Sequence, residues 1–508
     1  MSPPRRVAPT APSRRGWCPS LARPMPTGDG LLARVHPPLG CLTPTPARAV
    51  AAGARRFGNG HIDVTARANL QIRGVTDATR GGLAEALAAV ELGDVRNDGG
   101  PQRLTLTSPL AGLAASPIDI LDLARTIEAI GLAIPGLPPK TLIAVEAKPA
   151  GLGPAEADAH LVATAKGLAL HLAGDAGWWH VPVDDAPAVL DAALRGLAAS
   201  GRRRMRDLSA EDRAALVAGL RPAPMPPRGS LPRPGLITLD SQPAHVQRGL
   251  VLLEGFRTHR LHLDASLSPL WGEVRSGGGS AGLRTSRVTQ PPPSPTPPHT
   301  LDGSRAGPRS AGEEGRVEPA DGNPVALLVE APFGRCTADA LETLADAAES
   351  LGTHTLRLSA TRGFLLVAND EHAAETVRNT LAAAGFLTHR DDPRGAVAAC
   401  PGAPACASGS TPTLHDAAGL ADVFRPFAAR GLRAHVSGCA KGCAHPGAAD
   451  LTLVGRDGGY DVVLAGRADG LPARHLPFEA ARERLRRADS ALSLAQIFSD
   501  PPPGSRTP

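Results

Sequence analysis

A long internal repeat constrains the fold of this chain more than any other feature of its sequence. The segment from Val35 to Ile72 aligns without gaps to the segment from Val329 to Leu366, over thirty-eight positions and at an offset of 294 residues. Each copy reads as strand, turn, helix, glycine and strand, which are the local signals of a small mixed unit. The repeat therefore predicts a duplicated architecture of helices and strands.

Each copy carries its own helix boundaries. The first helix is predicted to begin at Thr45-Pro46 and the second at Thr337, because threonine favours the N-cap and proline suits the first turn. Gly58 and Gly352 stand where the two helices are expected to end, a position that favours glycine in a left-handed conformation.

The end of the first copy alternates polar and apolar residues. Residues 61–75 read HIDVTARANLQIRGV, with apolar side chains at most even positions. This period of two predicts one strand with a buried apolar face. The centre of its polar face is formed by Arg67, Asn69, Gln71 and Arg73. This face either meets water, as in most antiparallel sheets, or lines a cavity for an anion.

Composition divides the chain into seven parts. They are a disordered N-terminus (1–17), a half-unit (18–85), an α/β domain (95–227), a linker (228–323), a second half-unit (324–388), a second α/β domain (393–490) and a tail (491–508). Within the linker, residues 268–323 are rich in proline, glycine and serine and contain one aromatic residue. We expect this insertion to be disordered, because it cannot bury enough apolar surface to offset its ordering entropy.

Charge and hydropathy exclude two classes of function. The chain has 508 residues and a formal net charge of +5, supplied almost entirely by arginine. It has no dense basic block with interleaved aromatics, which argues against nucleic-acid binding and favours a small polyanionic ligand. No apolar run approaches the roughly eighteen residues of a membrane span, and the Pro- and Arg-rich start is no secretory signal. We expect a soluble cytoplasmic protein.

Four of the seven cysteines form two closely spaced pairs. ACPGAPACASG leaves five residues between Cys400 and Cys406, and SGCAKGCAHPG leaves three between Cys439 and Cys443. Four thiolates from two glycine-bearing loops fit one metal centre. The five-residue spacing is long for structural zinc and favours a [4Fe–4S] cluster, with zinc as the alternative.

The surroundings of the cysteines refine this interpretation. Gly402, Gly438 and Gly442 are expected to leave backbone N–H groups free to point at sulfurs, which would tune the cluster. The other cysteines are isolated in the sequence: Cys18, Cys41 and Cys336. We expect them to be buried thiols. An odd number of cysteines argues against a disulfide framework.

These motifs resemble a known superfamily. CPGAPAC with GCAKGCAHP resembles the cluster motif of nitrite and sulfite reductases, and TARANLQIRG is similar to their anion-binding strand. CPSLARPMPTGDGLLARV, LTSPLAG and LPPK look most like the precorrin-3B synthase branch. The resemblance covers residues 18–227 and 324–488. It implies two ferredoxin-like half-units that pair with two α/β domains, one carrying a [4Fe–4S] cluster, with a tetrapyrrole between them.

The resemblance also implies site residues. The cluster ligands would be Cys400, Cys406, Cys439 and Cys443. The side chains expected at the anionic tetrapyrrole are Arg67, Asn69, Gln71, Arg103, Lys140 and Arg362. Arg362 ends SATR, where the family has TPWR, so it is either a carboxylate partner or an exposed strand end.

The precorrin-3B synthase branch implies a monooxygenase of aerobic cobalamin biosynthesis, which hydroxylates precorrin-3A with O₂ and forms a lactone. Its electrons would come from NADH through a donor protein or reductase. Besides the cluster it would use a mononuclear non-haem iron, for which His435 and His445 beside the cluster loops are either ligands or loop residues.

Two alternatives stay open. One is a sirohaem-dependent sulfite or nitrite reductase, in which the last cysteine also bridges to the haem iron. Leu142 stands where those reductases carry a second lysine, so a small dianion would lose a charged hydrogen bond worth roughly 1.5–3 kcal/mol. The other is an electron-transfer or zinc-stabilised protein without catalytic activity.

Overall fold

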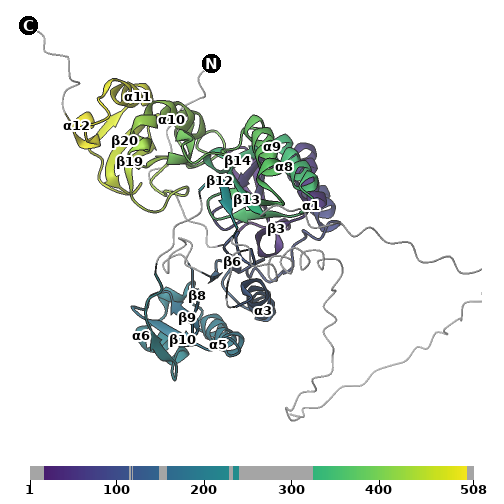
Figure 1. Cartoon of the computed structure of the whole chain (residues 1–508). Helices are drawn as coiled ribbons and strands as arrows, with labels where there is room; N and C mark the ends of the chain where they lie inside the picture. The colour runs from purple at the N-terminus through teal and green to yellow at the C-terminus, as the bar shows by residue number, and fades with distance from the viewer. Residues whose placement is uncertain are drawn as a thin grey trace, which may run out of the picture. The chain divides into compact units, whose positions relative to one another are not determined.

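The computed structural model describes residues 17–113, 116, 118–147, 157–227, 233–239 and 324–499 (Figure 1). These residues form four β-sheets with helices packed against them, which confirms the predicted α+β class. Apart from Trp17, the expected disordered N-terminus lies outside the described residues, and so does the insertion at 268–323.

The two half-units exchange short strands. The first sheet runs in the order β1 (Met25–Thr27), β2 (Gly30–Val35), β5 (Leu70–Val75), β4 (His61–Val64) and β14 (Arg335–Thr337). The second runs in the order β12 (Gly235–Thr238), β13 (Val325–Glu330), β16 (Gly363–Ala368), β15 (Leu356–Ser359) and β3 (Cys41–Leu42). Thus β14 of the second copy pairs with β4 of the first, and β3 of the first copy pairs with β15 of the second. Each copy completes the sheet of the other.

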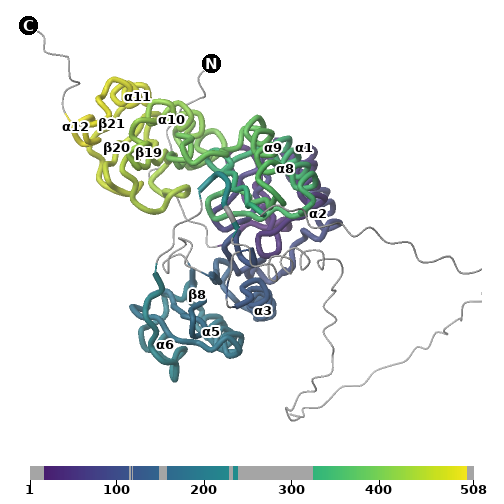
Figure 2. The backbone as a smooth tube through the Cα atoms, viewed as in Figure 1, coloured from purple at the N-terminus to yellow at the C-terminus, as the bar shows by residue number. Residues whose placement is uncertain are grey.

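Helices of the two copies also pack together. The half-unit helices are α1 (Pro44–Phe57), α2 (Arg80–Ala88), α8 (Ala338–Ser350) and α9 (Glu371–Ala383). Figure 2 shows α1 and α8 side by side, and Arg48 on α1 forms ion pairs with Asp346 and Glu349 on α8. Such solvent-exposed pairs add little to stability, because water and salt screen them. The larger stabilisation comes from one apolar core that includes Ile62 and Ile72 as well as Leu344 and Phe364.

The backbone bears out the repeat. Left-handed φ values recur at the offset of 294 residues in five pairs: Leu39 and Phe333 (48° and 56°), Gly40 and Gly334 (74° and 77°), Gly60 and His354 (78° and 45°), Ala68 and Arg362 (51° and 66°), and Glu91 and Gly385 (62° and 97°). The first two pairs belong to short 3-10 turns, η1 (Pro38–Gly40) and η3 (Pro332–Gly334), which lead into the exchanged strands. Left-handed backbone is uncommon for residues other than glycine, so its recurrence supports duplication.

The helix boundaries are correct in the second copy and wrong in the first. Thr337 caps α8 by accepting a hydrogen bond from the Ala340 N–H, and Gly352 is left-handed with a φ of 67°. In the first copy α1 begins at Pro44 rather than at Thr45-Pro46. Gly58 is extended rather than left-handed. A Cβ there would lie 2.4 Å from the Arg73 carbonyl oxygen, so close approach explains this glycine.

The prediction of one strand over residues 61–75 is wrong, because the chain turns back between β4 and β5. Thr65 closes the turn. Its N–H donates to the Asn69 carbonyl, and its Oγ1 accepts from the Arg67 and Asn69 N–H groups. Ala68 adopts the left-handed conformation that the reversal requires. The alternation of polar and apolar residues continues through the turn, so the sequence pattern does not reveal that the chain reverses here.

Two further sheets lie in the segments that the sequence predicts to be α/β domains. The third sheet has the order β11 (Arg221–Ala223), β10 (Trp178–Val181), β9 (Gly167–Leu172), β8 (Ala159–Thr164), β7 (Ile143–Glu146) and β6 (Thr105–Thr107). Its helices are α3 (Ile120–Ala133), α5 (Ala186–Ala199), η2 (Met205–Asp207) and α6 (Ala210–Leu216). The fourth has the order β17 (Val397–Ala399), β18 (Ala434–Ser437), β19 (Ala449–Arg456), β20 (Gly459–Gly466) and β21 (Arg474–Leu476). Its helices are η4 (Pro393–Ala396), α10 (Thr413–Ala429), α11 (Phe478–Arg487) and α12 (Leu494–Phe498). The last of these lies in the expected tail and packs on the core of this domain.

A buried carboxyl at the end of β13 makes stability depend on pH. Burial raises the pKa of Glu330 to about 7, against an opposing hydrogen bond from Thr361. The folded chain therefore holds this proton more tightly than the unfolded chain, so the free energy of unfolding falls as pH rises from about 4.5 to about 7. We expect Glu330→Gln to stabilise the protein at pH 8 by roughly 1–3 kcal/mol and to have little effect at pH 4.

Thermal unfolding of both proteins across this pH range measures the difference. The matched control is Glu85→Gln, at an exposed position on α2. A stabilisation by Glu330→Gln that does not change with pH would contradict the assignment.

Candidate functional site

The sheet of the last domain brings the two cysteine loops to one edge. Cys400 directly follows β17, and Cys439 follows β18 by two residues. These strands are parallel neighbours, so their carboxyl ends meet at the same edge of the sheet. The Gly438 N–H donates to Cys400 Sγ at 3.1 Å, which joins the two loops directly.

All four thiols of the two loops influence one another. Burial raises the pKa of Cys400, Cys439 and Cys443, the last to about 11, although Cys443 as a whole residue is exposed. The neighbouring thiols raise these pKa values further, and Cys406 acts on all three. Four neighbouring thiolates are unfavourable without a cation. Metal binding at this site must therefore release protons.

Backbone donors surround the sulfurs, as the glycines beside them predicted. N–H groups of Gly438 and Gly402 lower the pKa of Cys400, and that of Lys441 lowers the pKa of Cys439, each against the effect of burial. Gly442 differs from the prediction, since its N–H points to the Cys439 carbonyl at 3.5 Å. Gly402 has a φ of 60°, and a Cβ there would lie 2.5 Å from the Thr411 carbonyl oxygen. Only glycine fits this loop.

The chemistry of the donor set fits an iron–sulfur cluster. Four thiols from two adjoining loops are the ligands that a [4Fe–4S] cluster takes, and the Gly438 N–H beside Cys400 Sγ joins the loops. Within the described residues, no group of three or more His, Cys, Asp or Glu side chains is placed to hold a single metal ion.

No ligand set for a mononuclear iron is found in this part of the chain. The rings of His435 and His445 lie 5.8 Å apart between centroids, at a steep angle. His435 is fully buried, and neither of its ring nitrogens has a hydrogen-bond partner among the residues that the structure describes, whereas His445 Nε2 lies 3.1 Å from the Ala448 carbonyl oxygen. The described residues supply no third ligand beside them.

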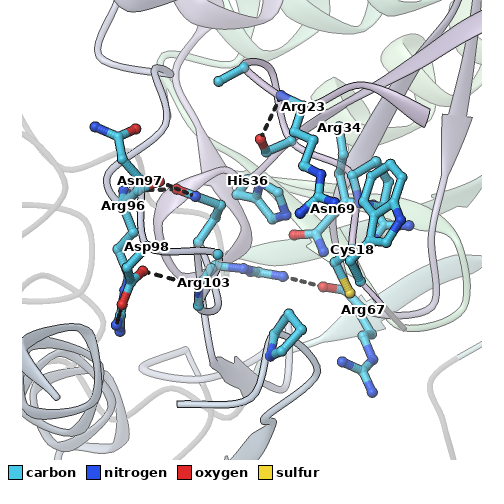
Figure 3. Close-up of a pocket in the computed structure, with 18 of the residues that line it drawn as sticks. Cys18, Arg23, Arg34, His36, Arg67, Asn69, Arg96, Asn97, Asp98 and Arg103 are labelled. Atoms are coloured by element: carbon cyan, nitrogen blue, oxygen red, sulfur yellow. Dashed lines mark hydrogen bonds and ion pairs between the residues drawn. The ribbon is translucent and has the colours of Figure 1, made fainter. Parts of the chain in front are cut away.

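A separate pocket of about 270 Å³ lies in the first half of the chain (Figure 3). Its lining includes Cys18, Arg34, His36, Arg67, Asn69 and Arg103. Figure 3 shows Arg103 reaching toward the backbone of Arg67, with Cys18 and Asn69 nearby. This volume suits one part of a large ligand, because whole drug-sized molecules fill about 300–1,000 Å³.

The pocket concentrates positive charge, and no carboxylate in the described part of the chain forms an ion pair with Arg34, Arg67 or Arg103, although Glu128 acts on Arg103 without direct contact. Burial lowers the pKa of Arg34 and Arg67, and that of Arg103 to about 10. Arg67 donates to the Lys140 carbonyl at 3.1 Å and Arg103 to the Arg67 carbonyl, so these bonds go to neutral acceptors. One buried nitrogen of Arg103, Nη1, has no partner among the described residues. An anion would meet donors that are already in place.

Three lining residues were not predicted from the sequence. Arg34 on β2 pairs with Gln71 on β5 and, with the Gln71 amide suitably oriented, donates to its oxygen at 2.6 and 3.0 Å. His36 is held neutral, because burial and the neighbouring Arg34 and Arg103 keep its pKa well below its usual range. Cys18 is half-buried and lines the pocket, so the expectation of an ordinary buried thiol is wrong for it.

The other isolated thiols divide in the same way. Cys336 is buried as expected, whereas Cys41 is half-buried.

The alternation of polar and apolar residues in GLLARVH could have pointed to Arg34. This residue on β2 pairs with Gln71 on β5, the strand that carries part of the predicted polar face.

The structure separates the predicted tetrapyrrole contacts into groups. Arg67, Asn69 and Arg103 line the pocket, as does Leu142. Gln71 accepts hydrogen bonds from Arg34 through its side-chain oxygen, and Lys140 accepts one from Arg67 through its backbone carbonyl. Arg362 instead donates to the Ala444 carbonyl at 2.6 Å, beside the second cysteine loop. Arg73, also on the predicted polar face, is 2% exposed and forms ion pairs with Asp29 and Asp63.

Comparisons with known proteins agree with this arrangement. A family model described as the nitrite/sulfite reductase ferredoxin-like half domain matches residues 23–90. A precorrin-3B synthase from Sinorhizobium sp is 30% identical over 473 residues, which cover 92% of this chain and 86% of that protein. The structure of the Mycobacterium tuberculosis NirA protein matches with a TM-score of 0.61 at 18% identity, over 90% of this chain and 80% of that one. This last similarity shows a shared fold. Among the described residues, no helix has both the length and the apolar character needed to span a membrane.

Proposed function

Because this chain belongs to the precorrin-3B synthase family, within the nitrite and sulfite reductase superfamily, we propose that it is a monooxygenase of aerobic cobalamin biosynthesis. Its substrate is precorrin-3A. One atom of O₂ enters a ring carbon as a hydroxyl group, and a ring acetate then closes to a lactone. The other oxygen atom leaves as water, with electrons that derive from NADH through a donor protein or reductase.

The observation that carries this proposal is the arginine pocket. A precorrin carries many alkyl carboxylates, and a planar guanidinium can hold a carboxylate through two hydrogen bonds. Arg34, Arg67 and Arg103 offer such donors from a partly enclosed site whose volume suits one edge of the macrocycle. The three residues bind and orient the substrate, and their positive charge favours its ionised carboxylates.

Two neutral residues shape the same pocket. His36 carries no charge at neutral pH, so it can donate or accept a hydrogen bond without adding to the positive field. Leu142 contributes an apolar wall where sulfite reductases have a lysine, so the pocket suits an organic carboxylate better than a small dianion. This is the feature that favours the synthase over the reductase.

Cys400, Cys406, Cys439 and Cys443 would hold a [4Fe–4S] cluster. When bound, such a cluster passes single electrons. The protein supplies buried sulfurs, backbone donors to two of them, and an exposed edge at Cys443. No step is assigned to a mononuclear iron, since the described residues do not offer its ligands.

A sirohaem-dependent sulfite or nitrite reductase is the second candidate. It is favoured by the match to the reductase half domain and by Arg67 and Arg103, which stand at matching positions. The purified protein separates the two candidates. We expect a brown protein with iron and acid-labile sulfide, no intense Soret band, and conversion of precorrin-3A that requires O₂. Sirohaem bands together with sulfite or nitrite reduction would overturn the synthase proposal.

A further inference from the structure

A buried arginine of the first half-unit holds the first cysteine loop. Arg73 on β5 donates from Nη2 to the carbonyl oxygen of Ala405 at 2.5 Å, directly before Cys406. Carboxylates fix the rest of the group: Nε and Nη2 donate to Asp29 at 2.9 and 2.7 Å, and Nη1 donates to Asp63 at 3.1 Å. The guanidinium is thus oriented with its remaining donor toward the loop.

The turn that carries Asp29 packs against the first cysteine loop as well. The Gly28 N–H donates to the Ala405 carbonyl oxygen at 3.1 Å, so this oxygen accepts from two elements of the half-unit. A Cβ on Gly28 would lie 1.9 Å from the Pro404 carbonyl oxygen. The contact leaves no room for a larger residue, and it sets how far the loop stands from β5.

A second buried arginine, from the other half-unit, holds the second cysteine loop. Arg362 lies in the turn between β15 and β16 and has a left-handed φ of 66°. Its Nη2 donates to the carbonyl oxygen of Ala444 at 2.6 Å, directly after Cys443. A Cβ on Gly334 would lie 2.7 Å from Arg362 Cδ, so the side chain is confined along its length.

The two arginines differ in charge balance. Arg73 and Arg335 share the two carboxylates Asp29 and Asp63, so their charges are matched locally. Among the described residues no carboxylate forms an ion pair with Arg362. Burial lowers the pKa of Arg362, and the Asp63 carboxylate, followed by the thiols Cys400 and Cys443, opposes that effect without direct contact.

We infer that Arg73 and Arg362 are positioning residues, which together clamp the two cysteine loops at the separation that a [4Fe–4S] cluster requires. Arg362 has an additional role, because its guanidinium is bonded to the residue after Cys443 and its positive charge favours the reduced cluster, which carries one more electron. The inference rests on the cluster of the proposed function. The repeat alone does not reveal the pair, since Arg362 aligns with Ala68 and Arg73 with Val367.

The test compares two substitutions at Arg362 with one at Arg73 in the full chain. Arg362→Gln removes the charge, whereas Arg362→Lys keeps it. We expect Arg362→Gln to release iron about tenfold faster and to make the reduction potential more negative, and we expect Arg362→Lys to restore the potential. Arg73→Lys keeps a charge between the same carboxylates but loses the fork. It should accelerate amide hydrogen exchange in residues 403–409 about tenfold and leave the potential close to that of the wild type.

A matched control is available on the strand that precedes Arg362. Arg357 on β15 is 4% exposed and also donates to backbone carbonyls, those of Pro109 and Ala111, which belong to neither cysteine loop. Arg357→Gln should change neither the potential nor the exchange of the cysteine loops. Equal effects of Arg357→Gln and Arg362→Gln would overturn the inference, because they would reflect general destabilisation.

The exchange measurement also separates this inference from the proposed function, because it needs no cluster. Faster exchange around residues 403–409 in Arg73→Lys and 440–447 in Arg362→Gln supports the clamp, even if the wild-type protein contains no iron or sulfide. In that case the cluster proposal fails, and the inference that the two arginines clamp the loops still stands. Unchanged exchange in both variants overturns the clamp, whatever the cluster content.

Discussion

Replacing Cys443 with serine is expected to reduce iron and acid-labile sulfide to background levels. A serine hydroxyl is a much poorer iron ligand than a thiolate, and Cys443 is the one exposed member of the four. Iron and sulfide analysis with the visible spectrum measures the loss. Serine is close to cysteine in size, so folding should be retained, with a melting temperature near that of apo wild type.

The matched control for this variant is Cys41→Ser. Cys41 is a half-buried thiol on the exchanged strand β3 and belongs to neither cysteine loop. It should keep the iron and sulfide content of the wild type. Full cluster content in Cys443→Ser would show that the four sulfurs do not act as one ligand set.

Substrate binding is expected to weaken by roughly tenfold to a hundredfold in Arg67→Ala. The substitution removes one charge-assisted interaction with a carboxylate, worth roughly 1.5–3 kcal/mol. It leaves the cysteine loops untouched, so the iron content should not change. Anaerobic titration with precorrin-3A, followed by fluorescence or absorbance, gives the dissociation constant.

Two variants control for the loss of charge. Arg67→Lys keeps the charge and should recover part of the affinity, because lysine lacks the planar fork. Arg56→Ala removes an exposed arginine whose side chain lies over Phe57, and it should bind as tightly as the wild type. Unaltered affinity in Arg67→Ala would mean that the arginine pocket does not receive the substrate.

The sequence predicted the features that depend on spacing. The repeat was detectable because thirty-eight positions keep the same order of strand, turn and helix. The convergence of the cysteine loops follows from two short motifs that each end a strand. Such local signals survive in a single sequence, since every residue that carries them lies within a few positions of the next.

Long-range partners could not be predicted in this way. Arg73 looked like a member of a polar strand face, yet its partners are Asp29, 44 residues earlier, and the Ala405 carbonyl, 332 residues later. The turn at Thr65 was hidden because it preserved the alternation on both sides. Arg362 and Arg67 look alike as basic residues near a strand end, and only the packing of separate sheets places one at a cysteine loop and the other in the pocket.

The reciprocal strand exchange has a consequence for how the protein is made. The first sheet is complete only when β14, at residues 335–337, has been synthesised, although its other strands end at residue 75. Until then β4 has an open edge, the kind of surface that invites wrong pairing during translation. The first sheet therefore stays incomplete during translation until β14 has been synthesised. A truncated chain that ends in the linker should aggregate rather than fold as an independent unit.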